Sequence, residues 1–291
     1  KVSCWTRRFN FRSCTKIKKM KILITGGSGF IGRNLIKSLK EDNEVFYPNS
    51  KELDLTNSEV VDNYFRNKYF DWVIHCAIKG GKRTKEDSLD TTYKNLSMFF
   101  NLMRNRDRYD QLINFSTGAE FDRSKDITGD NDVNNYFPLD CYGLSKNIIS
   151  RILKTNSTAY NLRIYGVFGI DEEPDRFFRS NILRSKSGDP IEIHQDRYFD
   201  FIYIEDLILV IKHYLTTKKE LLPIELDLVY PYKNKLSDIA DLFPGLNQTQ
   251  IQSSKRDKSY LGSAVKNIST LDPNLNFIGL KEGIKKIYDA L

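Results

Sequence analysis

Long hydrophobic runs, cysteine and histidine are scarce in this chain of 291 residues, and each scarcity excludes a class of protein. No apolar run approaches the roughly 20 residues that a helix needs to cross a bilayer, so we expect no membrane partner. Four cysteines and three histidines without metal-ligand spacing predict neither a metal site nor a disulfide framework. Only Cys76 and Cys141 lie beyond the first 19 residues, which favours a reducing, cytoplasmic location.

Excess positive charge is confined to the start of the chain. Lys and Arg number 45 against 38 Asp and Glu, for a formal net charge of +7. Residues 1–19 hold seven of the basic residues and no acid. The rest of the chain is therefore neutral, and we expect no nucleic-acid partner.

Met20 opens an apolar strand pattern, and we interpret it as the natural start of the protein. Residues 1–19 would then be a leader or an artefact, to be left out of fold reasoning. A transit peptide is the alternative, because the segment is rich in Arg and free of acids, although it lacks an initiating Met.

Short β-like runs alternate with amphipathic segments of helical length. The expected strands are 21–25, 44–47, 72–75, 111–116 and 160–164. The expected helices lie near 30–40, 57–68, 91–105 and 140–155, with later ones near 205–215 and 281–291. This alternation predicts an α/β fold with a doubly wound parallel sheet of the Rossmann type. After Gly169 we expect irregular structure, because Pro174 and Pro190 break helices.

Two units are expected along the chain. Residues 20–166 and about 201–229 would form a dinucleotide-binding domain. A smaller C-terminal substrate-binding lobe would draw on about 167–200 and 230–291, with the active site in the cleft between them. The polar stretch 233–258 is expected to hold loops.

A glycine-rich turn follows the first strand. Gly26 allows the tight turn, Gly29 lets backbone amides approach a pyrophosphate, and Gly32 lets the next helix pack closely on the sheet. The pyrophosphate would sit at the positive end of that helix, which begins at Phe30 and Ile31. A plain strand-to-helix turn is the alternative, but the placement between first strand and first helix favours dinucleotide binding.

The tip of the second strand bears on the choice of coenzyme. An acid there favours NAD, whereas Asn49, Ser50 and Lys51 tolerate the extra phosphate of NADP, so NADP is preferred. Lys51 is otherwise a solvated surface lysine. Asp54, followed by Leu55, would place a carboxylate beside the adenine or cap the next helix.

Tyr142 and Lys146 stand four residues apart in a helical stretch and so share one face. A nearby ammonium lowers a tyrosine pKa from about 10 toward neutrality, which would make Tyr142 a general acid/base. The lysine can also hold the nicotinamide ribose. Such pairs are common on helix surfaces, but this one follows a glycine loop and a strand that ends in Ser116 and Thr117.

Several motifs in order along residues 21–290 resemble the extended short-chain dehydrogenase/reductase superfamily, in its NAD-dependent epimerase/dehydratase branch that acts on sugar nucleotides. The motifs are Thr25-Gly-Gly-Ser-Gly-Phe-Ile-Gly32, Ile74-His75-Cys76-Ala77, Asn95, Phe115-Ser-Thr-Gly-Ala-Glu-Phe121, Tyr142-Gly-Leu-Ser-Lys146, Leu162-Arg163-Ile164-Tyr165-Gly166 and the segment from Arg197 to Asp206. The chain is most similar to reductases of the dTDP-4-dehydrorhamnose reductase and GDP-L-fucose synthase type.

The resemblance implies roles for single residues. Thr117 would bind the sugar oxygen, with Ser116 as its competitor, Tyr142 would transfer the proton and Lys146 would support both. Arg197 would face the substrate diphosphate, although a surface salt bridge is the alternative. The implied cofactor contacts are Gly26, Gly29, Phe30, Ile31, Gly32, Asn49, Ser50, Lys51, Asp54, Leu55, Cys76, Ala77, Ile78, Lys79, Tyr142 and Lys146. Further side chains of the expected lobe that would touch the sugar or merely pack are Phe177, Arg179, His194 and Tyr198.

Departures from the branch patterns narrow the reaction. The 4,6-dehydratases carry Asp-Glu directly after the catalytic Thr, where this chain has Gly118 and Ala119, with Glu120 one place too late. Fucose synthase-like enzymes carry a Cys where Ala119 stands. The remaining triad suffices for NAD(P)H-dependent reduction of a 4-keto-6-deoxy sugar nucleotide.

Two other functions stay open. A nucleotide-sugar 4-epimerase needs the same triad, and a non-catalytic cofactor-binding regulator is a remote alternative. The resemblance also implies a homodimer formed through the helices near 91–105 and 140–155.

Overall fold

A computed structural model of the chain describes residues 19–81, 86–129, 131–155, 158–245, 248–253 and 257–291. The interpretation of the first residues as a leader therefore lies outside the described residues. None of the described helices is both long enough and apolar enough to cross a membrane.

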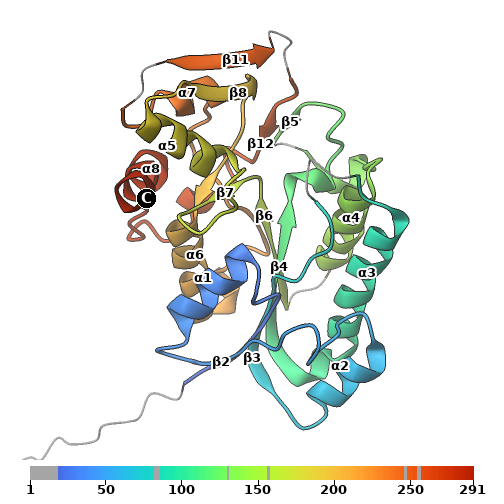
Figure 1. Ribbon diagram of the computed structural model, residues 1–291. Helices are drawn as coiled ribbons and strands as arrows, with labels where there is room; N and C mark the ends of the chain where they lie inside the picture. The colour runs from blue at the N-terminus through green and yellow to red at the C-terminus, as the bar shows by residue number, and fades with distance from the viewer. Residues whose placement is uncertain (1–18, 82–85, 130, 156–157, 246–247, 254–256) are drawn as a thin grey trace, which may run out of the picture.

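A six-stranded sheet forms the centre of the molecule (Figure 1). In spatial order its strands are β2 (Glu44–Phe46), β1 (Lys21–Thr25), β3 (Phe70–His75), β4 (Tyr109–Thr117), β6 (Ala159–Ile164) and β10 (Glu225–Asp227). All five pairings are parallel. The strand order reverses at β1, which has β2 on one side and β3 on the other. Such a switch point, at the carboxyl ends of the strands, is where doubly wound folds bind dinucleotides. The predicted α/β fold is thus confirmed.

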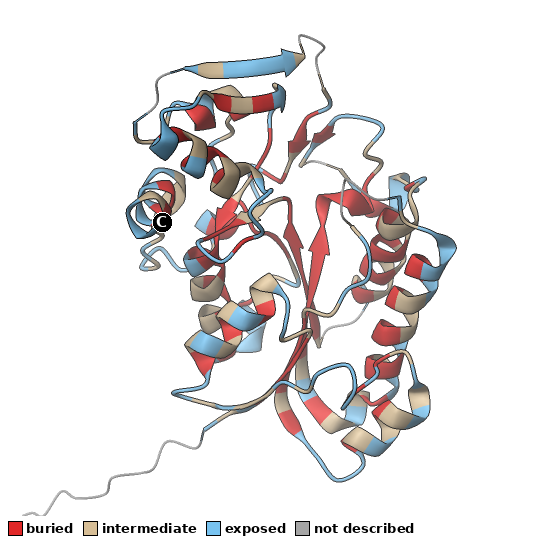
Figure 2. Ribbon diagram, viewed as in Figure 1, coloured by how far each residue is buried: buried red, intermediate tan, exposed pale blue. Residues whose placement is uncertain are grey.

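Helices cover both faces of this sheet, as the alternation of apolar residues requires (Figures 1 and 2). The helices are α1 (Phe30–Leu39), α2 (Ser58–Phe65), α3 (Leu89–Arg104), α4 (Cys141–Leu153) and α6 (Ile204–Thr216). Ile22 and Ile24 of β1 pack with α1 and α6, whereas Leu23 packs with α2, α3 and α4. Because successive strand residues point to opposite faces, every buried strand contributes to both layers.

A smaller group of elements lies beyond the carboxyl ends of the sheet strands (Figure 1). These are β5 (Ile127–Thr128), β7 (Val167–Phe168), α5 (Phe177–Ser187), β8 (Ile191–Gln195), β9 (Ile202–Tyr203), α7 (Leu236–Ala240), β11 (Thr249–Ser253), β12 (Tyr260–Leu261) and α8 (Gly279–Ala290). An apolar cluster that includes Phe168, Phe178 and Ile284 joins most of these elements, although it contains no residue of β11. It also takes Phe121 and Val133 from the first half of the chain, so the predicted division into domain and lobe stays a proposal.

The expectation of irregular structure over 170–200 is wrong. Helix α5 lies between the two prolines rather than across either of them. Gly188, with φ of 77°, closes the helix in the left-handed conformation, and Pro190 follows two residues later. The polar stretch 233–258 likewise contains α7 and β11 in addition to loops.

Asp206 ties the end of the chain to the sheet domain. Its carboxylate, on α6, accepts the backbone N–H groups of Ile278 at 2.7 Å and Gly279 at 2.9 Å, where α8 begins. The hydroxyl of Tyr230 donates to it as well. A buried carboxylate with three donors at the positive end of a helix is well satisfied, and it fixes the position of α8.

Candidate active site

The glycine turn after β1 is shaped by close contacts. Gly26 has φ of +67°, and a Cβ there would lie 2.6 Å from the backbone nitrogen of Ala77. A Cβ on Gly32 would lie 2.4 Å from the carbonyl oxygen of Gly26. A Cβ on Gly29 would meet only that same oxygen, at 3.3 Å. Gly26 and Gly32 therefore serve the turn and the packing, and Gly29 leaves its backbone accessible from one side.

The N-terminus of α1 is open to an anion. No side chain caps it, and its first turn contains no acid. The side chains of Phe30 and Ile31 pack against the apolar clusters, so only the backbone N–H groups of these residues could contact a ligand. Arg33 fastens the turn by donating to the carbonyl oxygens of Ser28 at 2.9 Å and Asp171 at 3.1 Å. This end of α1 fits the pyrophosphate of a dinucleotide.

A carboxylate does lie at the tip of β2, contrary to the expectation from sequence. Glu52 accepts the backbone N–H of Asn49 at 2.8 Å, because the turn folds back on itself. Asn49 in turn accepts the N–H of Lys51 at 2.9 Å. Asn49, Ser50 and Lys51 are all exposed, and the charge of Glu52 stands beside them.

Asp54 does not cap the following helix, so that expectation is wrong. It accepts the N–H and the hydroxyl of Thr56 at 2.9 and 2.7 Å, and it is exposed. Asn57 caps α2 instead, because it directly precedes the first helical residue. The side chain of Leu55 is buried in the core, which leaves only its backbone for a ligand.

The residues that follow β3 lie between the end of β1 and the start of α4. The N–H of Ala77 donates to the Thr25 hydroxyl at 3.3 Å. Asn95 holds Lys79 through both backbone groups, at 2.9 and 3.0 Å. A Cβ on Gly81, where φ is +82°, would lie 2.9 Å from the ring of Tyr142. Cys76, Ala77, Ile78 and Lys79 thus form one wall beside the glycine turn.

Thr117 and Tyr142 meet at the end of β4. Thr117 is the last residue of that strand, and its hydroxyl lies 2.9 Å from the hydroxyl of Tyr260. The Thr117 side chain also lies near Tyr142, where it acts to lower the pKa of that phenol. Burial raises the pKa of Tyr142, with Tyr260 adding to the rise and Arg123 opposing it. The expected depression of this pKa is therefore wrong for the protein alone, and Tyr142 keeps its proton at neutral pH.

Lys146 is not among the groups that shift the pKa of Tyr142. Its ammonium is buried and donates to the carbonyl oxygen of Phe115 at 2.6 Å. Burial lowers the pKa of Lys146 to about 8, while Glu120 and Cys76 oppose the shift. Burial, with the positive charge of Lys146 assisting, lowers the pKa of His75 to about 3. Lys146 therefore stands close to the carboxyl ends of β3 and β4, beside the loop that carries Cys76.

Ser116 and Thr117, the two candidates for binding the sugar oxygen, have side chains that point in opposite directions. The hydroxyl of Ser116 donates to the carboxylate of Glu120, inside the protein. Thr117 points the other way, to Tyr142 and Tyr260. This follows from strand geometry, since neighbouring residues face opposite sides.

A pocket of about 480 Å³ adjoins these groups. It is lined by Glu86, Asp87, Arg123, Leu139, Asp140, Cys141, Arg197, Lys258, Ser259 and Tyr260. Tyr260 belongs both to the pocket wall and to the hydrogen bond with Thr117, so the pocket opens beside the catalytic candidates. None of the four further lobe residues singled out in the sequence, Phe177, Arg179, His194 and Tyr198, lines it.

Arg197 lies in the pocket wall, as expected for a diphosphate ligand. It pairs with Asp257 at 2.6 Å, and its guanidinium carbon lies 4.9 Å from the ring centre of Phe199. Arg197 therefore does form a salt bridge, but not one on the surface, because its side chain is only 13% exposed. Arg123, which the sequence reasoning missed, is the second guanidinium of the pocket and pairs with Asp140 at 2.7 Å.

The most important residue that sequence reasoning missed is Tyr260. It lies 143 positions from Thr117 along the chain, on the two-residue strand β12. No local pattern marks it, because its position depends on how β12 pairs with β5.

Comparisons with known proteins agree with this geometry. The model of a family described as "NAD dependent epimerase/dehydratase family" matches residues 22–225. GDP-L-fucose synthase from Azorhizobium caulinodans is 36% identical over 109 residues, or 36% of this chain and 35% of that protein. UDP-glucose 4-epimerase from Lactobacillus helveticus is 27% identical over 248 residues, or 69% of this chain and 74% of that protein. The match to the fucose synthase thus spans only about a third of that relative.

Among solved structures, GDP-mannoheptose C4 reductase from Campylobacter jejuni, with NADP bound, superposes with a TM-score of 0.76. It is 18% identical and the match covers 94% of this chain and 98% of that one, which shows a shared fold. The predicted family branch is confirmed: the chain belongs to the NAD dependent epimerase/dehydratase family.

Proposed function

We propose that the protein reduces a 4-keto-6-deoxy sugar nucleotide at C4, with NAD(P)H as coenzyme and Tyr142 as proton donor. The observation that carries this proposal is the contact of Thr117 with Tyr142 and Tyr260 beside a pocket that contains Arg197. Gly118 and Ala119 follow Thr117, so no acid/base group stands where dehydratases and epimerising synthases keep theirs.

The roles of the chain's own residues follow from their environment. When bound, the nicotinamide coenzyme supplies the hydride. Thr117 donates to the substrate oxygen, and Tyr142, whose pKa burial raises, gives that oxygen its proton. Lys146 holds the coenzyme ribose and keeps a positive charge near the forming alkoxide. Arg197 and Arg123 face the diphosphate and the sugar.

The glycine turn and the α1 N-terminus would hold the coenzyme pyrophosphate. We keep NADP as the preferred coenzyme, since Lys51 and Ser50 are exposed at the tip of β2. Glu52 at the same tip favours NAD, so both coenzymes belong in the test.

A 4-epimerase is the second candidate. It is favoured by the alignment to UDP-glucose 4-epimerase, which covers more of this chain than the alignment to the fucose synthase. It uses the same Thr117, Tyr142 and Lys146 but returns the hydride to the sugar, so it consumes no coenzyme.

We further propose a cytoplasmic homodimer. Cys76 and Cys141 are free, in keeping with a reducing compartment. Helices α3 and α4 run side by side and in the same direction. Two hydrogen bonds show this, one from Thr92 to Cys141 and one from Asn95 to Ser145. They are the two helices that the family resemblance assigns to the interface.

The test follows NADPH and then NADH absorbance with the purified chain and a panel of 4-keto-6-deoxy sugar nucleotides. We expect stoichiometric oxidation of one coenzyme. Tyr142→Phe should lower kcat by about 10²–10⁴-fold. Tyr232→Phe, at an 80% exposed tyrosine, should leave it unchanged.

A different outcome selects the alternative. If no coenzyme is oxidised and UDP-hexoses interconvert in the same assays, the protein is a 4-epimerase. If the coenzyme binds but no sugar nucleotide reacts, the remaining candidate is a non-catalytic regulator that binds the coenzyme.

A further inference from the structure

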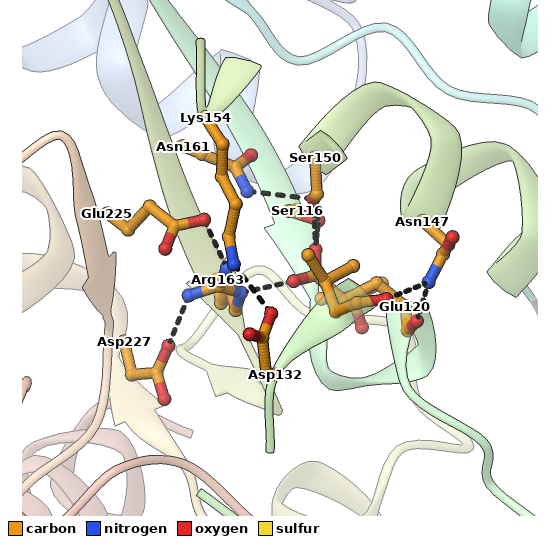
Figure 3. A network of polar contacts seen from close by, with 12 residues as sticks. Ser116, Glu120, Asp132, Asn147, Ser150, Lys154, Asn161, Arg163, Glu225 and Asp227 are labelled. Atoms are coloured by element: carbon orange, nitrogen blue, oxygen red, sulfur yellow. Dashed lines mark hydrogen bonds and ion pairs between the residues drawn. The ribbon is translucent and has the colours of Figure 1, made fainter. Parts of the chain in front are cut away.

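The buried carboxylate of Glu120 lies in a network of polar contacts with Ser116, Ser150 and Arg163 (Figure 3). Glu120 ends the short 3-10 turn Gly118–Glu120, and its side chain is fully buried. One carboxylate oxygen accepts the hydroxyls of both Ser116 and Ser150, and the other accepts Nε of Arg163. Glu120 does not line the pocket, and its carboxylate is engaged by these three partners inside the protein.

These contacts join the two elements that carry the catalytic groups. Ser116 immediately precedes Thr117 on β4. Ser150 lies on α4, four residues after Lys146 and on the same side of the helix. The amide of Asn147 adds a second link, because it donates to the backbone oxygen of Glu120 at 2.9 Å. One residue thus sets the end of β4 against α4.

Arg163, the ion-pair partner of Glu120, has other carboxylate partners as well. The guanidinium of Arg163, on β6, also pairs with Glu225 at 2.6 Å and with Asp227 at 3.4 Å. Breaking a buried ion pair is usually costly because one charge is left alone. Here Arg163 would keep two carboxylates, so a neutral residue at position 120 is compatible with folding.

The charge of Glu120 also reaches the active site. The titratable groups that act on or near Lys146 are Glu120, Cys76 and His75. Burial lowers the pKa of Lys146 to about 8, and Glu120 is the largest influence against that shift. Without it, Lys146 would lose its proton at a lower pH.

We propose that Glu120 is a positioning residue of the reaction: through Ser116, Ser150 and Asn147 it holds Thr117 in register with Tyr142 and Lys146. The inference rests on the proposed function for its kinetic part. The link that Glu120 makes between β4 and α4, and the effect of its charge on Lys146, hold whatever the protein catalyses.

The kinetic test compares Glu120→Gln with Glu225→Gln. Both remove one negative charge from Arg163, but only Glu120 is hydrogen-bonded to Ser116 and Ser150, which makes Glu225 the matched control. In Glu120→Gln we expect kcat at pH 8 to fall about fivefold, with KM nearly unchanged, if the pKa of Lys146 falls by one unit from about 8. The alkaline limb of the pH profile should move to lower pH. A profile that coincides with that of Glu225→Gln would overturn the proposal.

A double-mutant cycle tests the coupling without turnover. Unfolding is measured in urea for the wild type, Glu120→Gln, Lys146→Met and the double variant. We expect the two substitutions to be coupled by about fivefold in the unfolding equilibrium constant. The same cycle with Glu225→Gln should be additive. Additive effects in the Glu120 cycle would sink the inference, whereas coupling without any turnover would sink the proposed function alone.

Discussion

At the scale of single residues, the hydroxyl of Thr117 lies between two phenols. Tyr142 comes from the sheet domain and Tyr260 from the segment that β12 brings in from the end of the chain. Burial raises the pKa of Tyr260 to about 12, so it is a neutral hydrogen-bonding group at any working pH. Its contact orients the Thr117 hydroxyl, and it thereby makes the pocket wall part of the catalytic arrangement.

Tyr260→Phe should therefore impair chemistry more than folding. The substitution removes one hydrogen bond of ordinary strength among the contacts that orient the Thr117 hydroxyl, and we expect kcat to fall about tenfold. Tyr198→Phe is the control, since Tyr198 is 39% exposed and does not line the pocket. Steady-state kinetics decide the matter, and equal kcat values for the two variants would show that Tyr260 has no part in the reaction.

The sequence reveals some of these residues and conceals others for a physical reason. Thr117, Tyr142 and Lys146 follow from short motifs, because a strand end and a helix turn place them locally. Tyr260 and the contacts of Glu120 depend on pairings between distant segments. The raised pKa of Tyr142 was also out of reach, since burial and the direction of the Lys146 side chain decide it.

At the scale of elements, the repeating strand–helix pattern made the sheet domain predictable to within a few residues at most ends. Strand β10 was not predicted because two of its three residues, Glu225 and Asp227, are acids. Helix α5 was not predicted because Pro174 and Pro190 were taken as helix breaks, although both lie outside the helix. Strand β11 is largely exposed and polar, so it has no apolar periodicity to detect. Short or solvent-facing elements are stabilised by neighbours rather than by their own pattern.

The loop between β3 and α3 allows a test with a well-matched control. Gly81 and Gly279 both have φ of +82°, so alanine is strained by a similar amount at either site. A Cβ on Gly81 would press on the ring of Tyr142 at 2.9 Å, whereas a Cβ on Gly279 meets nothing within 4 Å. Each substitution should cost about 1 kcal/mol of stability.

Only Gly81→Ala should displace Tyr142 and the wall formed by residues 76–79. We expect weaker coenzyme binding by fluorescence titration and a kcat about tenfold lower, because small displacements of reacting groups are costly. Gly279→Ala should bind and turn over like the wild type. Equal losses in the two variants would mean that strain alone, and not the contact with Tyr142, limits the loop.

At the scale of the whole molecule, one face of α3 has no partner within the described chain. Leu89, Tyr93 and Phe100 are 76%, 67% and 44% exposed on this helix. Large apolar side chains in a row on one helix mark an interaction surface more often than isolated ones do. The neighbouring α4 extends the same side of the molecule, and a second copy of the chain would cover both helices by a two-fold contact.

A charge placed on that face should separate the copies. Tyr93→Glu would bring a carboxylate and its image together at a two-fold interface, so we expect sedimentation to report a dimer for the wild type and a monomer for the variant. Tyr232→Glu changes an 80% exposed tyrosine elsewhere in the same way and should remain dimeric. Since Thr117, Tyr142 and Lys146 all lie within one chain, the monomer should keep its coenzyme site. A wild type that sediments as a monomer would contradict the homodimer.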